Sequence, residues 1–134
     1  MTALNTEGRG WMSIPLVGVA ATTGGAIASV ANPEGVTVLI TRAILYISAN
    51  STGAANLTAG IGATATTAGD DIVAALAMAA AAGVAYNGFA TQVTAITAVT
   101  APAQWTATTF VTVQGSATTV GLAGTLFLEY VRLA

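Results

Sequence analysis

Residues 36–49, which read VTVLITRAILYISA, decide the fold class. The stretch is rich in β-branched residues, and Val36, Val38 and Ile40 alternate with threonine, which is the two-residue period of a β-strand. Its second half, residues 44–47, is apolar at every position and therefore on both faces. A strand that is covered on both faces lies inside a sandwich or faces another subunit.

Short β-like runs recur along the rest of the chain at a spacing of roughly ten residues. Turns rich in Gly, Asn and Pro separate them, and residues 32–35 (NPEG) have the residue order of a type I turn. The further runs are residues 14–20, 26–31, 55–62, 91–100, 105–113 and 122–133. We expect the run 55–62 to form a hairpin with the stretch 36–49.

This spacing predicts an all-β fold, an antiparallel β-sandwich or jelly roll of about eight strands. Residues 63–88 fit either a helix capped by Asp70 or Asp71 or a loop with a short strand, and we favour the loop and strand because the surrounding runs are β. Residues 1–13 hold two charges and no apolar period, so we expect an extended arm there. Residues 14–134 then form a single domain.

The composition excludes most kinds of chemistry. Only 6% of the residues are charged, and there is no His and no Cys. Disulfides, thiolate metal sites, histidine bases and Ser-His-Asp triads are therefore impossible. Three basic residues and a net charge of −2 cannot form the basic surface that nucleic acids require. We expect a protein that is not an enzyme and that uses no cofactor, no metal and no nucleic acid.

The mean hydropathy of +0.77 suggests either a membrane protein or a protein that hides its surface in an assembly. A spanning helix needs about 20 apolar residues. The best run, residues 72–86, is mostly alanine and contains Gly83, and the stretch 11–31 is broken by Pro15 and several Gly and Thr and lacks a basic leader. We therefore favour assembly over a membrane protein such as a holin. We expect a homo-oligomer, with a trimer as its expected size.

Few side chains remain as candidates for a functional site. Asp70 and Asp71 could hold Ca²⁺ with backbone oxygens and Asn87, although a helix cap or a solvated loop explains them more simply. Arg42 and Glu129 lie inside the two longest strand-like runs and would form a cross-strand pair if those runs were neighbours. Thr-x-Thr pairs are typical of ice-binding proteins, but here their spacing is irregular.

Five residues are the expected contacts with a partner or with a second copy. Trp11 is included because it lies in the arm, whereas Trp105 is expected in the core. The charges of the two long runs and the aromatic residue of the 36–49 stretch complete the set. These contact residues are Trp11, Arg42, Tyr46, Glu129 and Arg132.

From residue 36 onward the chain resembles small structural proteins of tailed bacteriophages. The resemblance rests on the strand ITRAILYI (40–47), the turn STGAA (51–55), the segments LTAGIG (57–62) and TTAGDD (66–71), AAGV (81–84) with YN (86–87), and GLAG (121–124) leading into LFLEYVR (126–132). It implies a jelly-roll capsid decoration or head-fibre protein on the outer surface of the virion. The implied partners are the major capsid protein and further copies of the chain. A receptor- or glycan-binding β-module of a fibre is the alternative.

Overall fold

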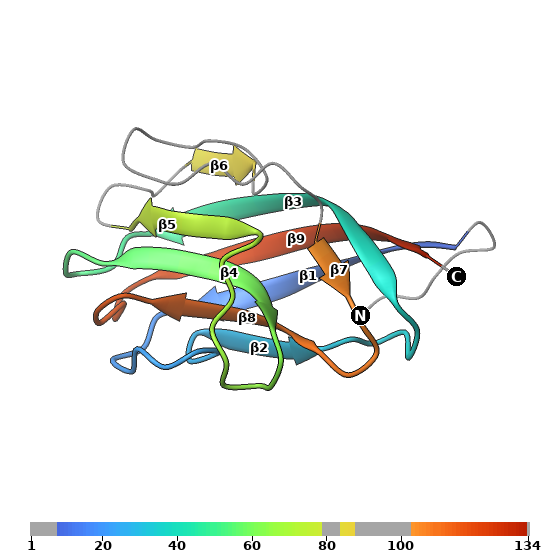
Figure 1. The fold of residues 1–134 in the computed structure, drawn as a ribbon. Coiled ribbons are helices and arrows are strands. Elements are labelled where there is room, and N and C mark those ends of the chain that lie inside the picture. Colours follow the sequence, from blue (N-terminus) through green and yellow to red (C-terminus); the bar gives the residue numbers. More distant parts are fainter. Residues whose placement is uncertain (1–7, 79–83, 88–102, 134) are drawn as a thin grey trace.

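The computed structural model describes residues 8–78, 84–87 and 103–133, which form two antiparallel sheets packed face to face (Figure 1). The first sheet has the order β1 (Arg9–Val17), β9 (Ala123–Arg132), β3 (Val38–Ala49), β6 (Val84–Asn87), and the short β7 (Ala103–Trp105) also pairs with β3. The second sheet has the order β2 (Ala28–Ala31), β8 (Phe110–Gly115), β4 (Asn56–Gly62), β5 (Val73–Ala77). No helix in the described part of the chain is long and apolar enough to cross a membrane.

The predicted sandwich of the jelly-roll type is confirmed. Apart from β7, each sheet has four strands, the first strand pairs with the last, and the chain passes repeatedly from one sheet to the other. The predicted hairpin between residues 36–49 and 55–62 is wrong, because β3 pairs with β9 and β6 whereas β4 pairs with β8 and β5. Leu57 and Ala59 of β4 are completely buried. Packing β4 across the sandwich, rather than beside β3, covers the apolar faces of both sheets.

Two strand boundaries differ from the prediction. Residues 9–13, expected in an extended arm, belong to β1, which begins at Arg9 and pairs with β9 along its whole length. The reason is the alternation of buried Met12 and Ile14 with exposed neighbours, which gives the strand an inner face. The run 105–113 is broken, because the Thr109 hydroxyl accepts a hydrogen bond from the Thr106 nitrogen (3.0 Å) and closes a turn between β7 and β8.

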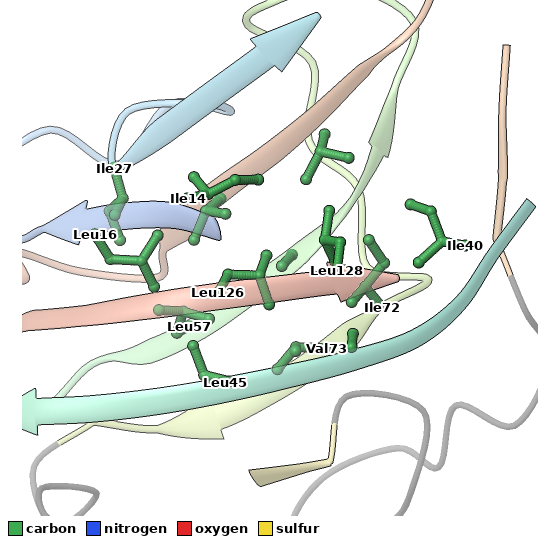
Figure 2. Packing of buried hydrophobic residues seen from close by; sticks show 14 of the residues in the cluster. Ile14, Leu16, Ile27, Ile40, Leu45, Leu57, Ile72, Val73, Leu126 and Leu128 are labelled. Atoms are coloured by element: carbon green, nitrogen blue, oxygen red, sulfur yellow. The ribbon is translucent and has the colours of Figure 1, made fainter. Parts of the chain in front are cut away.

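The ambiguous segment 63–88 is a loop followed by β5 and β6 where the structure describes it, as favoured from the sequence. The predicted strand at residues 91–100 lies outside the described residues. Between the sheets the inner faces form one hydrophobic core (Figure 2). Its labelled members include Leu16, Leu45, Leu57, Leu126 and Leu128, drawn from both sheets.

Three side chains meet at one end of the sandwich: the rings of Trp105 and Tyr130 and the amide of Asn32. Trp105 is completely buried and packs edge-to-face on Tyr130, with 6.1 Å between ring centroids and 86° between the ring planes. Gly10 lies opposite Tyr130 on the neighbouring strand, and a Cβ there would come within 2.5 Å of the Tyr130 ring. The Tyr130 hydroxyl donates a 2.7 Å hydrogen bond to Oε1 of Glu34. Bonds from Asn32 connect the same corner to the turn after β7.

The loop between β4 and β5 folds back over the outer side of the second sheet (Figure 1). The Thr112 hydroxyl donates to the Thr67 carbonyl (2.9 Å), and Oδ1 of Asp71 accepts from the Ile61 nitrogen (2.6 Å). Gly60 permits this approach, because a Cβ there would lie 2.5 Å from the Asp70 nitrogen. The chain itself therefore covers part of the outer side of the second sheet.

We predict that Asp71→Ala lowers the free energy of unfolding by about 1 kcal/mol, because it removes the acceptor of the Ile61 nitrogen. Asp70→Ala is the matched control and should change it by less than about 0.5 kcal/mol, since Asp70 is an exposed neighbour. Urea unfolding at neutral pH measures both values. Equal effects of the two substitutions would show that the hydrogen bond does not hold the loop.

Candidate assembly interface

Alternate residues of β1, β9 and β3 point away from the core and form the outer face of the first sheet. This outer face consists of Trp11, Ser13, Pro15 and Val17 from β1, Thr125, Phe127 and Glu129 from β9, and Arg42, Ile44 and Tyr46 from β3. Four large hydrophobic side chains on it are strongly exposed: Trp11 (61%), Val17 (67%), Tyr46 (41%) and Phe127 (42%). Only two other large hydrophobic residues in the described parts of the chain, Val120 and Leu133, are comparably exposed. Exposed apolar side chains that cluster on one face mark an interaction surface.

The strand register arranges this outer face in rows that run across the three strands. One row contains Trp11, Glu129 and Arg42. The next rows are Ser13, Phe127, Ile44 and then Pro15, Thr125, Tyr46. Directly opposite residues on neighbouring strands have Cβ atoms about 5 Å apart, so each row is a set of side-chain neighbours.

A β-bulge places Arg42 on this face. The register shifts between Ile40 and Arg42, so Thr41 and Arg42 are both exposed, and Ala43 beyond them is completely buried. Without the extra residue, strict alternation from buried Ile40 would direct Arg42 into the core. The bulge thus keeps the guanidinium out of the core and opposite Glu129.

The structure brings together four of the five contact residues predicted from the sequence. Trp11, Arg42, Tyr46 and Glu129 share the outer face, and the strands that carry Arg42 and Glu129 are neighbours, with these two residues directly opposite each other in the register. Arg132 is separate, because it pairs with buried Val38 at the end of β9. That any of the five touches a partner stays a prediction.

Sequence reasoning missed Phe127, Ile44 and Val17 as members of this face. Their strands are apolar on both sides, so alternation alone could not tell which side faces the core. The available signal was the position of Glu129 two residues after Phe127, which puts both side chains on the same side of the strand.

At one end of the outer face lies an open depression of about 610 Å³. Arg9, Trp11, Thr41 and Glu129 are among its lining residues. This lining offers an aromatic surface with one carboxylate and a guanidinium, which suits binding and provides no nucleophile paired with a base. Within the described residues, no three acidic side chains lie close enough together to hold a metal ion. Of the two aspartates considered for Ca²⁺, Asp71 uses Oδ1 to accept a hydrogen bond from the Ile61 nitrogen.

Comparison with known proteins gives one informative result. No family model and no curated protein matches the chain. Among solved structures, it is similar to a chain in a structure titled as the capsid of Ralstonia phage GP4, with a TM-score of 0.58 and 18% identity. The match covers 100% of this chain and 92% of the other. The two-sheet fold described above therefore also occurs in a chain of a phage capsid structure.

Proposed function

We propose that this chain is a structural protein of a bacteriophage virion, a decoration (cement) subunit that oligomerises and binds the outside of the head. The observation that carries the proposal is the fold similarity to a chain of the Ralstonia phage GP4 capsid structure, which covers 100% of this chain and 92% of the other. The major capsid protein is the proposed partner. The protein acts by binding and catalyses no reaction.

The proposed mechanism is stabilisation by burial of apolar surface. Each Å² of apolar surface removed from water contributes about 25 cal/mol as an upper guide. The outer face offers four strongly exposed hydrophobic side chains for this purpose. A chain with only 6% charged residues has little electrostatic repulsion to oppose such contacts. A subunit bound across neighbouring capsid proteins would resist their separation.

The test is binding to heads of the encoding phage that lack this chain. We expect the purified chain to co-sediment with such heads up to a saturating ratio, and to raise the temperature at which they release DNA. The chain centrifuged without heads is the control and should remain in the supernatant. A chain that stays in the supernatant with heads present would overturn the decoration role.

The second candidate is a receptor- or glycan-binding module of a fibre. One observation favours it: the exposed Trp11 ring lines a depression together with polar Arg9, Thr41 and Glu129, and sugars are bound by aromatic faces with polar neighbours. Antibody labelling of intact virions separates the two candidates. Label over the whole head supports decoration, and label confined to fibres supports this module.

A further inference from the structure

We infer that the outer face of the first sheet is the contact between two copies of this chain, which pack sheet to sheet about a twofold axis. The inference rests on the proposed function, in which a decoration subunit oligomerises, and it names the surface through which the copies bind. The outer face of one chain is covered by the outer face of a second chain.

The first argument is the difference between the two sheets. The second sheet is partly covered on its outer side by the loop that Asp71 and Thr67 hold in place. The outer face of the first sheet instead presents Trp11, Phe127 and Tyr46 at 61%, 42% and 41% exposure. The outer side of the central strand β9 thus exposes the aromatic ring of Phe127 between Thr125 and Glu129.

The second argument is that the pattern on the outer face is complementary to itself. A twofold axis that runs parallel to the strands, midway between β9 and β3, lays β9 of each copy over β3 of the other at the same level. Glu129 then faces Arg42 of the second copy, and Phe127 faces its Ile44. Thr125 faces its Tyr46 in the following row.

Opposite charges meet twice in this arrangement, and the apolar side chains of Phe127 and Ile44 also meet twice. An axis placed on β9 itself would instead oppose Glu129 to its own copy, which like charges disfavour. Reciprocal contacts of this kind define an isologous interface. Two sheets stacked in this way lie about 10 Å apart and cross at roughly 30°, so the match is best around the central rows.

The contact area follows from the same axis. β9 and β3 of one copy overlie β3 and β9 of the other on a strip of roughly 30 by 10 Å, because each residue advances about 3.3 Å and strands are about 4.8 Å apart. Two copies therefore bury roughly 600 Å² on this strip in flat projection, and the relief of the side chains adds to this. An area of this size is typical of a weak contact, below the roughly 1,200 Å² of standard specific interfaces. A twofold contact pairs copies, so we expect an even number of chains in place of the trimer expected from the sequence.

The experiment uses three charge variants of the full chain: Arg42→Glu, Glu129→Arg and Asp70→Arg. Native mass spectrometry and sedimentation equilibrium at low salt measure the assembly, and circular dichroism verifies that each variant is folded. We expect the wild type to be dimeric, and Arg42→Glu and Glu129→Arg each to raise the dissociation constant at least tenfold, because each gives the outer face two like charges. Asp70→Arg reverses a charge beside the second sheet and should remain dimeric.

The decisive sample is an equimolar mixture of Arg42→Glu and Glu129→Arg. In a mixed pair the acidic outer face of one chain meets the basic outer face of the other, so we expect heterodimers to form where neither variant associates alone. Restoration by mixing supports the inference, since a defect in folding within one chain cannot be repaired by another. A mixture that stays monomeric, single variants that stay dimeric, or a wild type that is monomeric or trimeric would overturn it. Co-sedimentation with heads tests the proposed function separately in every case.

Discussion

Replacing Trp105 with alanine is expected to lower the free energy of unfolding by about 3–5 kcal/mol. The side chain is completely buried, and its ring packs edge-to-face on Tyr130. Its Nε1 donates a 3.0 Å hydrogen bond to the Thr109 carbonyl. Truncation removes the largest side chain of the core, leaves a cavity, and leaves that carbonyl without the indole donor. A loss of this size is a large fraction of the stability of a domain with about 130 residues.

Urea unfolding monitored by far-ultraviolet circular dichroism measures this loss. Trp105→Phe is the matched control: it keeps an aromatic ring against Tyr130 but removes the indole donor, so we expect a smaller loss of about 1–2 kcal/mol. Should the alanine variant lose less than the phenylalanine variant, the corner between β7 and β9 would not be packed as described.

The strands themselves could be predicted from the sequence, because their side chains alternate and their turns contain Gly, Asn and Pro. The pairing of strands could not be predicted in the same way. The prediction paired residues 36–49 with 55–62 because they are adjacent in sequence, yet β4 crosses to the second sheet, where Leu57 faces the core. Local sequence cannot distinguish a hairpin from a crossover to the other sheet when both arrangements bury the same residues. Which arrangement forms depends on the distant strands that pair in the second sheet.

The outer face of the first sheet was predictable only in part. Arg42 and Glu129 stood out because charges are rare inside strands, and Tyr46 because it lies in a run that is apolar on both faces. The bulge after Ile40 was not predictable, since it depends on the register with β9. This bulge directs Arg42 outward, where it lies opposite Glu129. The proposed contact between copies uses these two charges.

The Asn32 amide connects two turns at the end of the sandwich where Trp105 and Tyr130 pack. Nδ2 donates to the carbonyls of Val36 (2.9 Å), Trp105 (2.9 Å) and Thr106 (3.1 Å), and Oδ1 accepts from the Glu34 nitrogen (2.8 Å). Only 9% of the residue is exposed. We expect Asn32→Asp to lower the free energy of unfolding at pH 7 by about 3–4 kcal/mol, because a carboxylate oxygen would replace the donor among three carbonyl oxygens.

The loss in Asn32→Asp should depend on pH in a defined direction. Burial and the three carbonyls raise the pKa of the new carboxyl group in the folded state above its unfolded value of about 3.9, so the folded state binds the extra proton more tightly. The variant is therefore closest to the wild type below about pH 4, and it loses stability as the pH rises from there through the folded-state pKa. Asn32→Ala has no titrating group and should lose about 2 kcal/mol relative to the wild type at every pH. The urea midpoints of the three proteins at pH 3.5 and 7.5 measure these differences. If the midpoints of Asn32→Asp and the wild type differ by the same amount at both pH values, the arrangement of carbonyls around Asn32 is contradicted.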